Sequence, residues 1–143
     1  MKKGILIGIA LLIVAAGSSY ASGEENINKF ILSTFRKQFS DAQEVKWEKL
    51  NDGARACFKL NEQTLYAYYS EDGEKKAIAR TIKSSQLPIH LSLALAKKYS
   101  DYYIADAFEV SANGSSSYFV VLDSPRRKLL LRSADGEEFT PLP

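Results

Sequence analysis

The sequence contains two side chains of the kinds that most often do chemistry, one histidine and one cysteine. His90 falls at the start of a predicted helix, where a solvated or capping role competes with catalysis or ligation. Cys57 alternates with Arg55 and Lys59 on one face of a predicted strand, and neighbouring cations lower a thiol pKa. A nucleophile also needs a base and a group that orients the base, and no Cys/His cluster provides them.

Four aspartates at matching positions look like paired carboxylates. Asp72 and Asp135 precede glycine in predicted hairpin turns, whereas Asp41 and Asp101 begin strands just past helix ends. Turn and strand chemistry therefore accounts for all four. A Ca²⁺ site needs several oxygen ligands alternating along a loop, and "SEDGE" (70–74) is too short to provide them. We expect no metal site.

The sequence also contains neither a Gly-rich phosphate loop nor a G-x-S-x-G nucleophile motif. These sequence features together predict a protein that is not an enzyme. We expect no catalytic residues and no cofactor.

The first 21 residues have the three parts of a secretory signal peptide. "MKK" is a positive start, "GILIGIALLIVAA" is an apolar run, and Ser19 and Ala21 stand at the −3 and −1 positions of a cleavage site. The run is short for a bilayer span, which takes about 20 apolar residues. We expect cleavage after Ala21 and a periplasmic or secreted chain of residues 22–143, not attached to the membrane. An uncleaved anchor is the alternative.

Charge is balanced once this segment is removed. The whole chain has 19 basic and 17 acidic residues, and loss of Lys2 and Lys3 leaves 17 of each. A nucleic-acid-binding surface needs a basic patch, and no run of like charge provides one. We expect no nucleic-acid partner, and the single cysteine cannot form an internal disulfide.

Two segments have the apolar periodicity of amphipathic helices. The first is "NINKFILSTFRKQF" (26–39), with Asn26 as a candidate N-cap. The second is "LPIHLSLALAKKY" (87–99), with Pro88 suited to the first helical position. The predicted apolar stripes are Ile27, Phe30, Ile31 and Phe35 in the first helix, and Leu91, Ala94, Leu95 and Tyr99 in the second.

Each predicted helix is followed by four strand-like runs joined by short turn signals. The turns are "NDG" (51–53), "NEQ" (61–63), "EDG" (71–73), "NGSSS" (113–117), "SPRR" (124–127) and "ADG" (134–136). Such links are too short for parallel crossovers. We therefore predict an α+β domain in which two helices cover one face of a long antiparallel sheet.

The two halves of the sequence also resemble each other. "KQFSDAQEVKWEKL" (37–50) matches "KKYSDYYIADAFEV" (97–110) in its helix end, aromatic-Ser-Asp step and alternating strand. We predict two repeats, about 26–84 and 85–143, each with one helix followed by a four-stranded antiparallel meander. Two copies are too few for a solenoid, so a single pseudo-symmetric domain is expected.

Four stretches give the chain a resemblance to a known family: "FSDAQEVKW" (39–47), "YAYYSEDGE" (66–74), "LP" (87–88) and the closing "ADG". In this order they resemble the PepSY-like proteins, small exported bacterial proteins grouped by fold with the β-lactamase inhibitory protein. The resemblance covers about residues 27 to 140 and implies the helix-plus-four-strand repeat and an exported location. It implies no established activity, and inhibition of β-lactamase belongs to the named relative. Ser40 departs from the proline common at this position.

The stretch "LYAYYSEDG" (65–73) carries aromatic side chains on both faces of one predicted strand. Alternation places Leu65 and Tyr69 on one side and Tyr66 and Tyr68 on the other. The face under the helices is predicted to hold Val45, Trp47, Ala56, Phe58, Leu65, Ala67, Tyr69, Ile78, Phe108, Tyr118, Val120, Leu129 and Leu131. The opposite face receives Lys46, Glu48, Arg55, Cys57, Lys59, Tyr66, Tyr68, Ala77, Ala79, Phe119, Val121, Leu130 and Arg132. Since two helices cover only one face, the other is expected to meet water.

That second face mixes Tyr and Phe with Arg and Lys, the types enriched where proteins bind one another. We predict a non-enzymatic, exported, inhibitor-like binding module that engages a protein or peptide there. Tyr66, Tyr68 and Phe119 would be anchors, and Arg55 and Arg132 would set the orientation. The alternative is that tyrosine is simply a good strand former with a wettable hydroxyl.

Two other functions are compatible with the same pattern. The abundant core aromatics would allow a carrier that holds a small apolar ligand between helices and sheet, although packing alone explains them as well. An unpaired edge strand could instead bind another chain or a second copy, which leaves the oligomeric state open.

Overall fold

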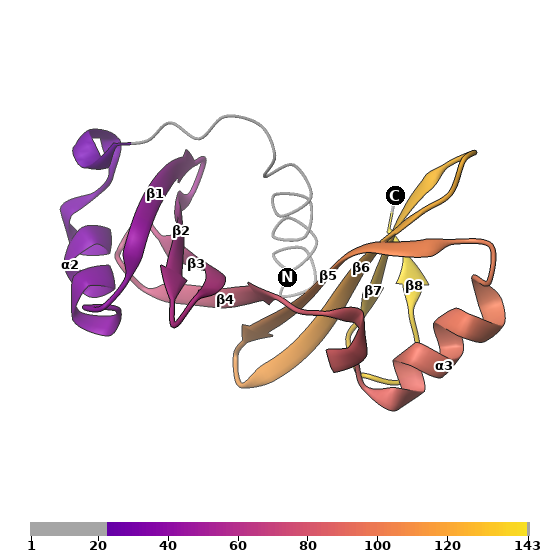
Figure 1. The fold of residues 1–143 in the computed structure, drawn as a ribbon. Helices are drawn as coiled ribbons and strands as arrows, with labels where there is room; N and C mark the ends of the chain where they lie inside the picture. Colours follow the sequence, from indigo (N-terminus) through magenta and orange to yellow (C-terminus); the bar gives the residue numbers. More distant parts are fainter. Residues whose placement is uncertain (1–22, 143) are drawn as a thin grey trace. The chain divides into compact units, whose positions relative to one another are not determined.

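The computed structural model describes residues 23–142, so the predicted signal peptide and its cleavage site lie outside the described residues. The fold is α+β, with two helices and an open antiparallel sheet of eight strands whose order follows the chain (Figure 1). The helices are α2 (Lys29–Gln38) and α3 (Ile89–Lys98), each preceded by a 3-10 turn, η2 (Glu24–Asn26) and η3 (Ser84–Gln86). The strands are β1 (Gln43–Leu50), β2 (Gly53–Leu60), β3 (Gln63–Ser70), β4 (Lys75–Thr81), β5 (Tyr103–Ala112), β6 (Ser115–Asp123), β7 (Lys128–Ser133) and β8 (Thr140–Pro141).

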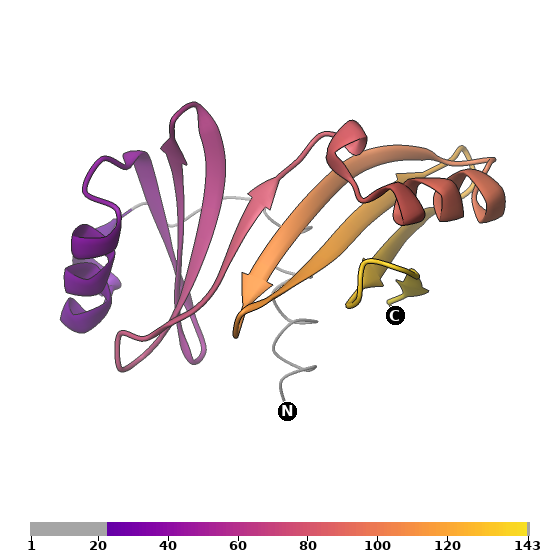
Figure 2. The same cartoon turned by 90° about the horizontal axis from the view of Figure 1, so that it is seen from below.

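The chain divides into two compact units. The N-terminal unit comprises residues 23–80 with 111–115, and the C-terminal unit comprises residues 81–110 and 116–142. In the element order, α2 precedes β1 to β4 and α3 precedes β5 to β8 (Figure 2). The predicted helices, turns and antiparallel strands therefore occur in the expected order.

Tight turns fix the strand register of the N-terminal unit. Leu50 pairs with Gly53 across a two-residue turn, and Asn61 and Glu62 join β2 to β3 with φ of 51° and 65°. Positive φ at both central residues suits the twist of a hairpin. Gly53 has a separate reason to be glycine, because an added Cβ would lie 1.8 Å from the backbone oxygen of Tyr69. Two strands approach too closely there for any side chain.

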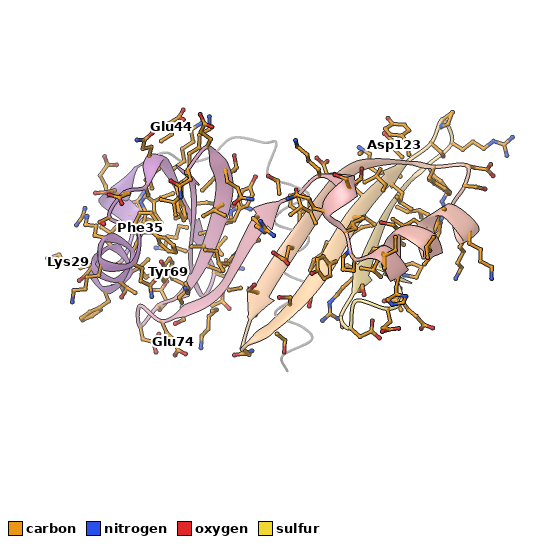
Figure 3. The ribbon with its side chains drawn as sticks, turned by 60° about the horizontal axis from the view of Figure 1, so that its bottom comes forward. Lys29, Phe35, Glu44, Tyr69, Glu74 and Asp123 are labelled. Atoms are coloured by element: carbon orange, nitrogen blue, oxygen red, sulfur yellow. The ribbon has the colours of Figure 1, made fainter. Side chains whose placement is uncertain are left out.

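Aromatic rings dominate the core between α2 and its strands. The Phe35 ring lies 5.1 Å from the rings of both Trp47 and Phe58 and 6.5 Å from that of Tyr69, between centroids. Phe35 and Tyr69 lie together between helix and sheet (Figure 3). The Tyr69 hydroxyl donates to Gln38 Oε1 at 2.9 Å. The buried cluster consists of Ile27, Ile31, Phe35, Trp47, Ala54, Ala56, Phe58, Ala67 and Tyr69, and every member except Ala54 occupies a position predicted to lie on the apolar stripe or to face the helix.

Three predictions for this unit are wrong. The helix begins at Lys29, and its N-cap is Asn28, whose Oδ1 accepts a hydrogen bond from Phe30 N at 2.7 Å. Asn26 is therefore not the cap. Phe30 lies about 100° around the helix axis from Ile31, on the side away from Phe35, so it is outside the buried stripe and 68% exposed. Ile78 pairs with Ala67 but is only half-buried and lies outside the cluster under α2.

The C-terminal unit has a more aliphatic core under α3. Its buried members are Leu87, Leu91, Leu95, Ala107, Val120, Leu122, Leu131 and Phe139, with Tyr118 and Leu129 packed against them. Pro88 occupies the N-cap position of α3 and provides no side-chain cap. The prediction that Phe108 lies under the helix is wrong, because Ala107 takes that place. Ile104 also packs against the cluster, three residues earlier, so strict alternation fails once between Ile104 and Ala107.

Candidate binding face

Two rows of side chains cross the N-terminal unit on the face of the sheet opposite α2, here called the helix-free face. Short turns connect these four strands in sequence, so the strand register places their residues side by side. One row is Glu48, Arg55, Tyr68 and Ala77, and the next is Lys46, Cys57, Tyr66 and Ala79. The predicted parity of these eight residues is confirmed.

Arg55 lies in the first of these rows, beside a charged and an aromatic neighbour. Its guanidinium forms an ion pair with the Glu48 carboxylate, and its Cζ lies 5.6 Å from the centroid of the Tyr66 ring. The Arg55 side chain is 1% exposed, against 29% for Glu48. A buried positive charge needs a partner of opposite sign, because an uncompensated charge in the protein interior strongly destabilises the fold. The contact with the ring adds a cation–π attraction.

Tyr68 lies beside Arg55 in the same row and is buried. Burial raises the pKa of the Tyr68 hydroxyl well above its ordinary range, and the nearby Arg55 guanidinium opposes that rise only in part. The phenol therefore stays protonated at neutral pH and cannot act as a base.

The expectation that the sheet face opposite the helices meets water is wrong for three of the five predicted binding residues. Arg55, Tyr68 and Phe119 are 2%, 3% and 1% exposed, whereas Tyr66 and Arg132 are half-buried. Alternation sets the side on which a residue lies but not its depth. Removing these side chains from water costs little free energy. The rings of Tyr68 and Phe119 are largely apolar, and Glu48 neutralises the charge of Arg55.

The C-terminal unit has a similar pairing of arginine with an aromatic ring. Phe119 of β6 is the cross-strand partner of Arg132 of β7, and Arg132 Cζ lies 6.0 Å from the Phe119 ring centroid. The five predicted residues thus form two separate groups. Arg55, Tyr66 and Tyr68 are together in one unit, and the Phe119–Arg132 pair is in the other.

Glu48 is the residue of this site to which sequence reasoning assigned no role. A signal for it was present. A two-residue turn that pairs Leu50 with Gly53 also fixes the pair Glu48 and Arg55 farther along the hairpin. Opposite charges at directly opposed positions indicate a cross-strand ion pair.

The turn aspartates behave as the sequence predicted. Asp135 Oδ1 accepts hydrogen bonds from the backbone N of Glu137 at 2.8 Å, and Asp72 Oδ1 accepts from the backbone N of Glu74 at 3.3 Å and from the Ser70 hydroxyl. These hydrogen bonds lower the pKa of both carboxyl groups. Both side chains stabilise turns.

The other candidate chemical groups belong to different units. His90 is exposed in the first turn of α3, and Cys57 is half-buried on β2. Within residues 23–142, no three His, Cys, Asp or Glu side chains are grouped to hold a metal ion. In the same part of the chain, neither α-helix has the length and apolar composition needed to cross a membrane.

Neither of two surface hollows is lined by residues of the two rows on the helix-free face. One, of about 500 Å³, is in the C-terminal unit between η3, α3 and the start of β5, and its apolar lining includes Leu95, Ile104 and Leu122. The other, of about 920 Å³, is polar and lies at the end of β1 and β2, where Lys59 Nζ pairs with Glu44 Oε2 at 3.2 Å. Of these two, the first has the lining expected of a site for an apolar ligand.

Comparisons with known proteins identify the fold. No family model matches the chain, and no curated protein matches it by sequence, so membership of the PepSY-like family is not confirmed. Three solved structures are similar at 15% sequence identity, and at that identity the likeness shows the fold alone.

All three structures are from Bacteroides. A protein presumed to be periplasmic from Bacteroides eggerthii has a TM-score of 0.73 and matches 80% of this chain and 88% of its own. A DUF2874 family protein from Bacteroides ovatus has a TM-score of 0.72, with 82% and 89% covered. A BLIP-like protein from Bacteroides fragilis has a TM-score of 0.68, with 82% and 86% covered. The chain therefore has a BLIP-like fold.

Proposed function

We propose that this protein is a non-enzymatic, exported binding module that engages a protein or peptide through the helix-free face of its sheet. The observation that carries the proposal is the arrangement of Arg55 between Glu48 and the Tyr66 ring. Arginine and tyrosine are among the side chains that most often dominate binding energy in protein interfaces. Here the Tyr66 ring is held against Arg55 before any partner arrives, which lowers the entropy lost on binding.

The residues of the proposed site differ in exposure, and exposure determines which of them can contact a partner. Tyr66 is half-buried and Lys46 is exposed, so these two can touch a partner directly. Arg55 acts as a positioning residue that holds the Tyr66 ring. Tyr68 is buried beside Arg55 and is not exposed to a partner, and Phe119 is buried against Arg132 in the other unit.

The fold and the location of its structural neighbours support an exported binding role. One neighbour is described as BLIP-like and another as presumed periplasmic. An inhibitor-like action, in which the module covers a site on another protein, is one form of this proposal. The repeat of helix and four strands also belongs to the proposal, because it would give each half its own arginine–aromatic pair.

The test uses purified residues 22–143 as bait in an extract of the exported compartment. Tyr66→Ala is expected to lose a captured protein that the wild type retains, while Tyr66→Phe keeps it. Tyr103→Ala is the matched control, because Tyr103 is 63% exposed on β5 and belongs to the C-terminal unit, in neither row of the helix-free face. Equal capture by the Tyr66→Ala and wild-type baits would refute the site. Tyr68→Ala is unsuitable, since truncating a buried ring destabilises the fold by about 3 kcal/mol.

A second candidate function is a carrier of a small apolar ligand, and the hollow beside α3 favours it. Its serine and tyrosine hydroxyls, including those of Ser92, Tyr99 and Tyr102, would orient a ligand over the apolar floor. Native mass spectrometry of the purified mature chain tests this function. A retained small molecule that is lost in Ser92→Phe supports the carrier, and a mass equal to that of the bare chain opposes it.

A further inference from the structure

β1 is the end strand of the sheet. Among the described strands it pairs with β2 alone, and it is eight residues long (Figure 1). Four of its residues are exposed, compared with one in β2 and none in β3. A long edge strand offers backbone N–H and C=O groups to another chain unless something prevents pairing.

Charge alternates along β1 in a way that suits a second copy of the same strand. Lys46 and Glu48 lie on one face on either side of Trp47. If two copies pair antiparallel about a two-fold axis at Trp47, Lys46 of each copy lies opposite the partner's Glu48. The symmetry produces this contact twice, and opposite charges directly across a strand pair are attractive.

The neighbouring symmetric registers are unfavourable. An axis at Lys46 would oppose two lysines, and an axis at Glu48 would oppose two glutamates, both of which are repulsive. An axis at Val45 would need Glu44 in regular pairing. However, Glu44 has a φ of 52° and lies in an irregular part of β1, so regular pairing at Glu44 is unfavourable.

We propose that β1 is a homodimerisation edge at which residues 45–49 of two copies pair antiparallel around Trp47. The irregularity at Glu44 limits the pairing to this short segment, so the dimer should be weak and form at high protein concentration. Directly opposed residues of an antiparallel strand pair project to the same side of the sheet. The helix-free faces of both copies would therefore lie on the same side of the joined strands. The proposal does not depend on partner capture by Tyr66.

Sedimentation velocity of residues 22–143 over a range of concentrations tests the proposal. The wild type is expected to form a dimer that weakens when NaCl is raised to about 0.5 M. Lys46→Glu turns two attractive contacts into repulsive ones and should raise the dissociation constant at least about tenfold. Lys49→Glu is the matched control. It changes the net charge equally, but Lys49 would lie opposite the partner's uncharged Val45, so a change within about twofold is expected.

Circular dichroism of each variant separates loss of pairing from loss of folding. Slower hydrogen exchange of β1 amides at high concentration, with β7 amides unchanged, would support the edge. A chain that stays monomeric up to about 1 mM would overturn the proposal. So would a dimer that Lys46→Glu leaves unchanged, or one that Lys49→Glu weakens as strongly.

Discussion

The two units pack helices of the same length with different side chains. α2 and α3 are both ten residues long, and each buries its third and seventh residues, Ile31 and Phe35 in one and Leu91 and Leu95 in the other. Around Phe35 the neighbours are rings, whereas around Leu95 they are mostly aliphatic. The positions of burial are thus set by the helix–strand arrangement, while the chemistry that fills them can vary.

A second difference lies at the helix starts. α2 is capped by Asn28, which accepts from Phe30 N and donates through Nδ2 to Glu71 O at 2.8 Å. α3 starts after Pro88 without a side-chain cap. Proline pre-sets the backbone angle instead of satisfying a free N–H group. The two helices are therefore started by different physical means.

Truncating the two equivalent core residues should have the largest effects. Phe35→Ala removes a ring that contacts four others and should lower the free energy of unfolding by about 4 kcal/mol. Leu95→Ala should cost about 3 kcal/mol. Urea unfolding of both variants measures the difference. If Leu95→Ala lowers the free energy of unfolding more than Phe35→Ala does, the aromatic cluster does not stabilise its unit more strongly than the aliphatic core stabilises the other.

Gly53→Ala should have the next largest effect and lower the free energy of unfolding by about 3 kcal/mol, because the added methyl group must displace the backbone of Tyr69. Gly114→Ala is the matched control in the β5–β6 turn. Nothing lies within 4 Å of its added Cβ, and only its φ of +76° is unfavourable, so about 1 kcal/mol is expected. Equal melting temperatures for the two variants would show that the close approach at Gly53 is unimportant.

Asn28→Ala should lower the free energy of unfolding by about 1 kcal/mol, since α2 loses its cap. Asn28→Asp keeps the oxygen that accepts from Phe30 N and should recover most of that loss. Thermal unfolding followed by circular dichroism measures both. If Asn28→Ala and the wild type unfold together, α2 does not depend on its cap.

The smallest effect is expected from the turn aspartates. The pKa of Asp72 and that of Asp135 are lowered in the folded state by hydrogen bonds to turn groups. Their stabilisation is therefore complete above the ordinary carboxyl pKa and is lost as the pH falls through the lower folded value. Asp72→Asn and Asp135→Asn should unfold with a weaker pH dependence below about pH 4. Denaturant midpoints measured over the acidic to neutral range check this, and unchanged slopes would contradict it.

Much of the fold could be predicted because alternation and turn residues carry direct physical information. Trp47, Phe58 and Tyr69 share one parity and face α2, as expected. The prediction for Phe30 is wrong because the buried stripe of α2 is centred on Ile31 and Phe35, and Phe30 lies about 100° around the axis from Ile31. The prediction for Phe108 is wrong because β5 breaks its alternation, and nothing in the sequence of that strand marks the break.

The sequence pattern predicted on which side of the sheet the candidate site residues lie, but not how deeply they are buried. Tyr66 and Arg55 lie on the expected side, and their contact follows from the register of tight hairpins. Sequence patterns do not measure how much of a face is removed from water, so the burial of Arg55 and Tyr68 could not be foreseen. The binding role of these residues stays a prediction.

Site-specific photocrosslinking tests binding through the helix-free face most directly. A benzophenone side chain is placed at Tyr66 on that face or, as the control, at exposed Ser33 on α2. In cells that export the protein, we expect a discrete protein adduct from position 66 and none from position 33. Adducts of equal yield from both positions, or from position 33 alone, would contradict binding through the helix-free face.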